Sequence, residues 1–421
     1  MTGQHSESRL DRLPMALINE IEPAPVDQVL DEDHLLAPAG VPGWRPEKGP
    51  ARIRSSWRGS DGALVPGALD QASVIIRTDA GRLVDGRDYT IDPFWGSLER
   101  STAGGSEVAA GPARVRLSYR WSRRRVDSVS QDRDGRWHVW QGAEHLAAPT
   151  PPELPEHQRR VANVFVDHFA RTGRILYCDR SRPRRHLDQR ERLARVRTKI
   201  SSGRPVRIVC WGDSVTAGGD ASSPAAAFPA LLGRRLGEAW GEDRVELHTV
   251  AVDGSSTSDW LDPGTAAAAG LRGSAPLPAD LDAVLGLEPD LVISEFVNDA
   301  WLAADVRQRN HERLLELFRT IGADWMITTP HFTAGAWMGT ARLDAPDGRP
   351  LTRFLRAFAS RHRLALADVS RRWEALYDDG LPYPTLLNNG VNHPDDRGHA
   401  LAADVITAAL GVVPHSLGEP A

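Results

Sequence analysis

The segment VRIVCWGDSVTAG, residues 206–218, decides the fold of the second half of the chain. Its first residues are mostly apolar, which is typical of a strand buried on both faces, and the Gly-Asp-Ser that follows predicts a turn where this strand ends. Similar short apolar runs follow, separated by segments with helical periodicity such as 228–240 and 312–321. These runs lie at residues 245–250, 291–294, 325–328 and 364–367. Strands that alternate with helices indicate a parallel sheet covered by helices on both faces.

A serine and three polar segments stand where such a sheet binds ligands. Ser214 follows the first strand, and the carboxyl ends of parallel strands share the edge at which open α/β folds bind their ligands. VDGSST at 252–257 follows the second strand, EFVND at 295–299 follows the third, and GVNHP at 390–394 opens the last helix. In this order the four blocks resemble the SGNH, or GDSL-type, hydrolase family. The resemblance spans roughly residues 204–412 and implies a flavodoxin-like, three-layer α/β fold for residues 204–421.

The resemblance also implies a role for each matching residue. Ser214 matches the nucleophile and His393 the base, while Ser214, Gly254 and Asn298 match the donors of the oxyanion hole. A serine hydroxyl is a weak nucleophile at neutral pH, so an adjacent imidazole must take its proton. The tetrahedral oxyanion needs preorganised donors, and losing one donor typically costs about 3 kcal/mol of transition-state stabilisation.

Two positions depart from the family pattern. Phe296 stands where the family commonly has a glycine, and we expect it to reshape the wall of the pocket. Gly390 stands where the family usually has the aspartate that orients the histidine. The imidazole of His393 is then held by the Asn389 side-chain carbonyl, by a backbone carbonyl, or by a carboxylate from elsewhere, of which Asp395 is the nearest. A Ser/His dyad is the working hypothesis.

Further polar residues near these blocks have structural or pocket interpretations. His331 follows the fourth strand and is a candidate pocket residue, whereas Asp213 and Asp299 are expected to brace their loops, with Asp213 also a candidate for the pocket. His399 is expected to pack against or cap the last helix. Cys210 lies within the first strand and is interpreted as a small core residue.

The first half of the chain has a different pattern. Residues 1–45 are interpreted as an N-terminal arm. Residues 46–150 are interpreted as a β-rich accessory domain with a β-sandwich or jelly-roll-like fold. Apolar and polar residues alternate at 114–121, and further strand patterns occur at 73–77 and 137–140. Residues 151–203 are predicted to be a helical connector, with helices at 158–171 and 187–200. The tryptophans of the accessory domain are interpreted as core, with a sugar-stacking surface as the alternative; they are Trp57, Trp95, Trp121, Trp137 and Trp140.

Composition excludes several classes of function. The chain has 421 residues, of which 41% are hydrophobic and 25% charged, and this composition is typical of a globular protein. Its net charge of −5 is not typical of a nucleic-acid binder. Its two cysteines have no metal-binding spacing, and we expect no metal or organic cofactor. No signal-peptide pattern and no membrane-spanning apolar run is evident, so no membrane partner and a cytoplasmic location are expected. The sequence does not determine the oligomeric state.

These observations predict a serine esterase that acts through an acyl-Ser214 intermediate with His393 as base. A β-rich domain ahead of the hydrolase domain is similar to the arrangement in two-domain carbohydrate esterases, which implies a short acyl ester, with acetyl favoured, on a sugar or glycoside. The alternative is a retired hydrolase scaffold that acts as a carbohydrate-binding or assembly protein, motivated by the missing aspartate at Gly390. Reactivity of Ser214 toward a fluorophosphonate distinguishes the two.

Overall fold

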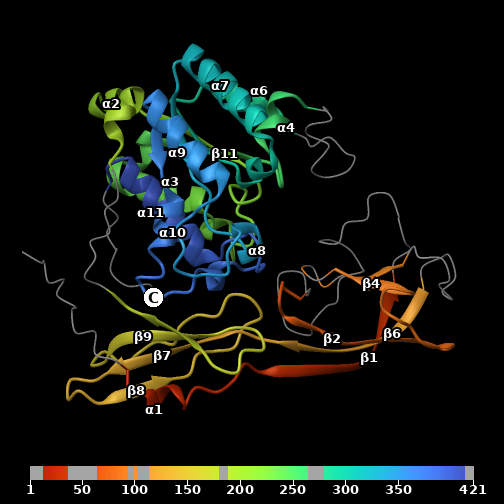
Figure 1. Ribbon diagram of the computed structural model, residues 1–421. Helices are drawn as coiled ribbons and strands as arrows, with labels where there is room; N and C mark the ends of the chain where they lie inside the picture. Colours follow the sequence, from red (N-terminus) through yellow and green to blue (C-terminus); the bar gives the residue numbers. More distant parts are fainter. Residues whose placement is uncertain are drawn as a thin grey trace, which may run out of the picture.

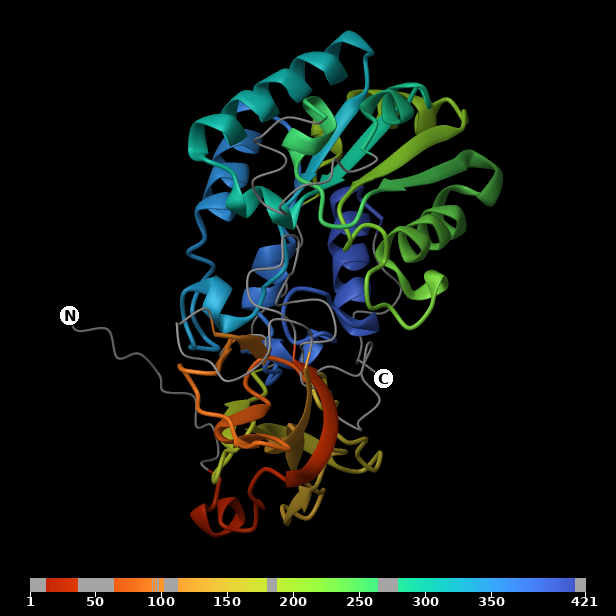
Figure 2. The same cartoon turned by 90° about the vertical axis from the view of Figure 1, so that its right-hand side faces the viewer.

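The computed structural model describes residues 13–36, 64–92, 94, 96, 98–101, 113–179, 188–263 and 279–412. An α/β unit occupies one end of the molecule and two antiparallel β-sheets occupy the other (Figure 1). The same division is visible after a quarter turn, where the first half of the chain lies below the α/β unit (Figure 2). Among these described residues, no helix combines the length and apolarity needed to span a membrane.

The α/β unit is built on a five-stranded sheet in which every pair of neighbours is parallel. In chain order its strands have the spatial order 2-1-3-4-5, which is the flavodoxin-like order. The fold class predicted from the alternating pattern is therefore confirmed. The strands are β11 (Val206–Gly212), β12 (Val245–Ala251), β13 (Leu291–Glu295), β14 (Asp324–Thr328) and β15 (Ala365–Ala367).

Helices cover both faces of this sheet, and alternate residues of one strand show why. Ile208 and Cys210 of β11 belong to one apolar cluster, whereas Val209 and Trp211 belong to another on the opposite face. The first face is covered by α2 (Ala194–Ser201), α3 (Phe228–Trp240), α10 (Val369–Glu374) and α11 (Asp396–Ala409). The second is covered by α4 (Thr257–Leu261), α6 (Leu281–Leu285), α7 (Ala304–Thr320) and α9 (Pro350–His362).

Short elements connect these layers. A four-residue helix follows β14, and single turns of 3₁₀ helix occur in the loops on either side of the sheet. They are α8 (Gly335–Met338), η1 (Arg190–Arg192), η2 (Pro224–Ala226), η3 (Glu242–Arg244), η4 (Val297–Trp301) and η5 (Tyr383–Leu386).

The first half of the chain is β-rich, as predicted. One antiparallel sheet has the order β1-β6-β2-β3 and a second has the order β10-β9-β7-β8, while β4 and β5 form a separate pair. The elements are α1 (Met15–Ile18), β1 (Val26–Leu36), β2 (Leu69–Thr78), β3 (Gly81–Arg82), β4 (Tyr89–Ile91), β5 (Leu98–Arg100), β6 (Ala113–Ser122), β7 (Arg125–Gln131), β8 (Trp137–Trp140), β9 (Arg159–Val166) and β10 (Arg174–Tyr177). Part of the expected N-terminal arm is strand β1, which pairs with β6 along its length.

The predicted helix at residues 158–171 is wrong, because β9 and the turn after it occupy this segment. A short apolar run that is buried on both faces has no periodicity that separates a strand from a helix. Here Val164 packs into the cluster beneath α1, whereas Phe165 packs into the cluster shared with α3 and α11. The second predicted connector helix, at 187–200, is represented by α2 and the single turn η1. The second β-sheet thus shares a core with the α/β unit.

Candidate active site

The nucleophile candidate sits in a tight turn at the end of β11. A side chain at Gly212 would place its Cβ 2.2 Å from the Glu295 carbonyl oxygen, so only glycine allows β11 and β13 to run this close together. Asp213 follows and accepts the N–H of Val215 at 3.0 Å, which closes the turn. Ser214 is therefore presented at the carboxyl edge of the sheet, as the sequence predicts.

The structure brings Ser214 and His393 together although they are far apart in sequence. The Oγ of Ser214 lies 2.9 Å from Nε2 of His393. On the other side of the ring, Nδ1 lies 2.9 Å from Oδ2 of Asp220. A carboxylate can only accept here, so Nδ1 carries the hydrogen and Nε2 is free to accept the serine proton. Three side chains thus form one continuous chain of hydrogen bonds.

Asp220 is the carboxylate in contact with the imidazole, and sequence reasoning missed it; the two residues predicted for the orienting role lie elsewhere. Asn389 accepts the backbone N–H groups of Val391, Asn392 and His393 through Oδ1, so it shapes the loop and does not hold the imidazole. Asp395 caps α11 by accepting the N–H of Gly398, and its other oxygen pairs with Arg397 at 2.6 Å. The dyad hypothesis is therefore replaced by a triad geometry.

The nucleophile loop itself delivers Asp220 to the imidazole. Asp220 has a φ of +62°, a left-handed conformation that aspartate tolerates better than most residues. A Cβ at Gly219 would lie 3.0 Å from Cε1 of His393, so the absence of a side chain lets the ring approach the loop. Asn388 donates to the Asp220 carbonyl at 3.3 Å and ties this loop to the loop that bears the histidine. The sequence offered one signal for this role of Asp220: it is a carboxylate six residues after Ser214, in the loop that leaves the same edge of the sheet.

Gly390, the position of the usual family aspartate, has a physical reason to be glycine. Its φ is +69°, which is strained for a residue with a side chain. A Cβ there would also lie 2.8 Å from Cβ of Val65, which belongs to the N-terminal β-rich region. That region therefore packs directly against the histidine loop and occupies the space that the usual aspartate would need.

The three predicted oxyanion donors surround the same sheet edge. Within the described part of the chain, neither the N–H of Ser214 nor that of Gly254 has a hydrogen-bond acceptor. Gly254 is the third residue of a four-residue turn, which is closed by a hydrogen bond from Ser255 N–H to the Val252 carbonyl. Its φ is +70°, and a turn with a positive φ at the third position favours glycine there. The amide of Asn298 donates to Asp213 at 3.0 Å and to the Ser255 carbonyl at 3.2 Å. Both backbone donors are available, whereas the Asn298 amide must release its longer bond to reach an oxyanion.

Asp213 belongs to a group of buried carboxyl groups beneath the serine. It accepts the amide of Asn298, and burial raises its pKa to about 6. Glu295 lies beside it, and burial together with the charge of Asp213 raises the pKa of Glu295 well above its ordinary value. Because of this raised pKa, Glu295 keeps its proton beside the Asp213 carboxyl group. Burial likewise raises the pKa of Asp299 to about 7, although Thr257 donates to it twice. Asp213 and Asp299 thus brace the loops, as predicted.

The protonated state of Glu295 gives a pH-dependent prediction. The native protein keeps a proton that the unfolded chain loses above a pKa of 4.5, so stability falls as the pH rises from that value through the native pKa. Glutamine cannot lose a proton. The melting temperature of Glu295→Gln, relative to wild type, should therefore rise between about pH 5 and about pH 8. Glu316→Gln, on the exposed face of α7, makes the same chemical change outside the core as a control. A difference for Glu295→Gln that stays constant with pH would contradict a protonated Glu295.

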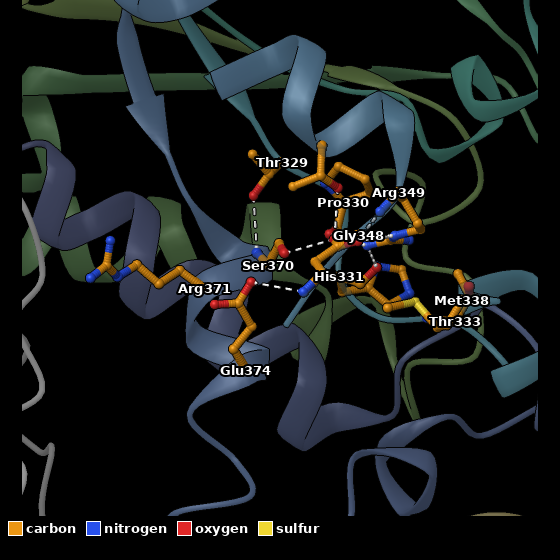
Figure 3. A network of polar contacts seen from close by, with 12 residues as sticks. Thr329, Pro330, His331, Thr333, Met338, Gly348, Arg349, Ser370, Arg371 and Glu374 are labelled. Atoms are coloured by element: carbon orange, nitrogen blue, oxygen red, sulfur yellow. Dashed lines mark hydrogen bonds and ion pairs between the residues drawn. The ribbon is translucent and has the colours of Figure 1, made fainter. Parts of the chain in front are cut away.

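The two other predicted pocket residues point into the protein. Phe296 packs edge-on against Trp211, with ring centroids 4.6 Å apart, and is part of the core beneath α7 and α9. His331 is buried, which lowers its pKa to about 3, and its Nε2 donates to the Asn392 carbonyl at 2.7 Å. Arg349 holds the same segment by donating to the carbonyls of Pro330 at 3.0 Å and His331 at 2.8 Å (Figure 3). His331 thus supports the histidine loop from behind.

Two further residues have the structural places predicted for them. His399 is fully buried, stacks on Phe228 and accepts the Phe228 N–H at 3.3 Å. Burial raises the pKa of the Cys210 thiol to about 12, so it remains uncharged and is not a competing nucleophile.

Part of this chain is similar to a known protein family and to several solved structures. Residues 210–401 match the GDSL-like Lipase/Acylhydrolase family. No curated protein sequence matches the chain. Among solved structures, a two-domain esterase active on acetylated mannans is 19% identical, with a TM-score of 0.40 over 54% of this chain and 56% of its own. An acetylxylan esterase from Geobacillus stearothermophilus is 17% identical, with a TM-score of 0.39 over 51% of this chain and 99% of its own.

A third solved structure, an α/β hydrolase enzyme from the metagenome of Lake Arreo, Spain, is 21% identical, with a TM-score of 0.37 over 50% of this chain and 97% of its own. The chain spans about half the length of the two-domain esterase, 56%. The family match at residues 210–401 covers the part of the chain that holds the four sequence blocks, which gather at one edge of the sheet of 2-1-3-4-5 order.

Proposed function

We propose that the protein is a serine esterase with Ser214 as nucleophile, His393 as general base and Asp220 as the residue that orients the base. The hydrogen-bonded chain of these three side chains, 2.9 Å at each step, is the observation that carries the proposal. Such a chain is recognised by its geometry and roles, whatever the order of its members in the sequence. The proposal concerns the whole chain, because the N-terminal region packs against the loop that bears His393.

The proposed reaction proceeds in two halves. As Oγ of Ser214 attacks the ester carbonyl, its proton passes to Nε2 of His393, and the oxyanion forms facing the N–H groups of Ser214 and Gly254. The imidazolium, held by Asp220, then protonates the departing alcohol oxygen, which leaves an acyl-Ser214. In the second half His393 takes a proton from water, the resulting hydroxide attacks the acyl carbon, and the proton returns to Ser214 as the acid leaves.

Asn298 enters this scheme as a third, conditional donor. Its amide bond to Asp213 fixes the side chain, while the 3.2 Å bond to the Ser255 carbonyl is the weaker of the two. A developing negative charge competes for that hydrogen more strongly than a neutral carbonyl does. The donor is therefore recruited in the transition state, which is where stabilisation accelerates the reaction.

The proposed substrate is a short acyl ester, with acetyl as the favoured acyl group, on a sugar or glycoside. The sequence resemblance to two-domain carbohydrate esterases supports this substrate class. Trp301, an exposed tryptophan in the same 3₁₀ turn as Asn298, supports it from the structure.

Labelling with a fluorophosphonate probe tests the proposal, because only an activated serine reacts with it. We expect the wild-type protein to be labelled at Ser214 and the Ser214→Ala variant to remain unlabelled. His393→Ala keeps the serine but loses its base, so its labelling should be slower by several orders of magnitude. A wild-type protein that folds but does not react would support the retired scaffold instead.

A further inference from the structure

Two tryptophans from different loops meet beside the candidate active site. Trp301 is the last residue of η4, and Trp337 lies in α8, after the next strand of the sheet. Their ring centroids are 5.3 Å apart and the rings are perpendicular, an edge-to-face arrangement that fixes both. Trp301 is nevertheless 52% exposed. Because an indole normally buries a large apolar area, this exposure leaves a rigid aromatic face open to solvent.

The turn η4 places Trp301 close to the oxyanion donor Asn298. In a 3₁₀ helix the side chains of residues i and i+3 eclipse each other, so Asn298 and Trp301 project from the same side of this turn. With a rise of about 2 Å per residue, they are separated by roughly 6 Å along its axis. An ester carbonyl held by Asn298 would therefore have the indole within reach of the group attached to it.

The helix α8 places Trp337 next to the histidine loop. Ala334, immediately before α8, donates its N–H to the Val391 carbonyl at 2.6 Å, and Val391 lies two residues before His393. The tryptophan pair is thus connected to Asn298 through η4 and to the His393 loop through the start of α8.

The N-terminal β-rich region contributes a third ring to this aromatic cluster. Phe94 stacks on Trp337, with ring centroids 5.9 Å apart and an interplanar angle of 18°. Both views agree that α8 lies at the end of the α/β unit that faces the β-strands of this region (Figures 1 and 2). The cluster therefore joins the two halves of the molecule beside the catalytic residues.

We propose that Trp301, supported by Trp337, is a stacking surface for a pyranose ring of the acylated carbohydrate. This inference rests on the proposed function and specifies how that site selects its substrate. The C–H bonds on one face of a pyranose are weakly positive and apolar, and they complement the negative face of an indole, while the hydroxyl groups at the ring edge stay hydrated. The surface is assigned to the α/β unit and not to the accessory tryptophans considered from the sequence. Of these, Trp121 is buried core, Trp137 and Trp140 lie on β8, and Trp57 and Trp95 are outside the described residues.

A comparison of two substrates tests the inference. The kcat/KM for acetylated xylooligosaccharides is divided by the kcat/KM for 4-nitrophenyl acetate, which has no sugar. This ratio does not depend on the fraction of folded enzyme. Trp301→Ala should lower the ratio by about five- to tenfold, the usual effect of one lost aromatic contact, whereas Trp301→Phe should keep it within about twofold. Trp137→Ala, the same change on β8, is the matched control and should leave the ratio as in wild type.

Three results would overturn the inference. They are an unchanged ratio in Trp301→Ala, an equal fall in Trp137→Ala, and a selective loss toward 4-nitrophenyl octanoate, which would make Trp301 part of an acyl-chain surface. A binding measurement separates this inference from the proposed function, because it needs no hydrolysis. In calorimetry on the Ser214→Ala protein, xylopentaose or mannopentaose should bind, and adding Trp301→Ala should weaken that binding by about five- to tenfold. Failure of both sugars to bind overturns the stacking surface even if Ser214 is reactive.

Discussion

Replacing Ser214 with alanine should lower the kcat for 4-nitrophenyl acetate by at least about 10⁴-fold. The substitution removes one oxygen atom, the atom that the geometry aims at Nε2 of His393 from 2.9 Å. No acyl intermediate can form without it, and only the oxyanion donors and substrate positioning remain. The Ser214 side chain is almost fully buried, with 6% exposed, but it lies in a turn and outside the apolar clusters, so the fold should be retained.

Ser223→Ala is the matched control for this experiment. Ser223 lies in the same loop, nine residues further along, and its side chain is exposed. Its turnover should stay within about twofold of wild type. Steady-state kinetics on the purified variants gives the kcat of each, and the melting temperature shows that each is folded. Wild-type turnover by Ser214→Ala would exclude it as nucleophile and make the candidate site a structural feature.

Replacing Asp220 with asparagine should lower kcat by about 10³- to 10⁴-fold. Asparagine tolerates the left-handed conformation at φ +62°, so the loop should keep its course. The carboxylate that accepts from Nδ1 of His393 is lost, however, and an amide N–H at that place favours the tautomer with hydrogen on Nε2. That tautomer cannot accept the serine proton, and the imidazolium formed during the reaction loses its counter-charge. The KM should change much less than kcat.

Asp395→Asn makes the same chemical change two residues after His393 and serves as the control. Asparagine caps helices as well as aspartate does, so α11 should persist when Asp395 is replaced. We expect activity within about tenfold of wild type, a barrier change of roughly 1.4 kcal/mol. The opposite ranking, with a large loss for Asp395→Asn and a small one for Asp220→Asn, would contradict the orienting role of Asp220.

Sequence reasoning succeeded where local pattern and sheet geometry lead to one answer. Five apolar runs alternating with helices predict the parallel sheet, and the structure has a strand at each of them. The same reasoning failed at residues 158–171, where an isolated apolar run became strand β9 because its two sides face two different cores. Nothing in the local pattern distinguishes that strand from a buried helix.

The sequence by itself determined which loops hold Ser214, Gly254, Asn298 and His393, because parallel strands bring the loops at their carboxyl ends to one edge, and ester chemistry restricts the residue types. Only the tertiary structure decided which carboxylate meets the imidazole. The Asp220–His393 contact joins residues 173 positions apart, and it depends on a left-handed residue and on a glycine that admits the ring. Likewise, Val65 from the N-terminal region fills the space beside Gly390, and the pairing of Trp301 with Trp337 arises from two separate loops. Contacts of this kind depend on how distant segments pack, and no local periodicity encodes them.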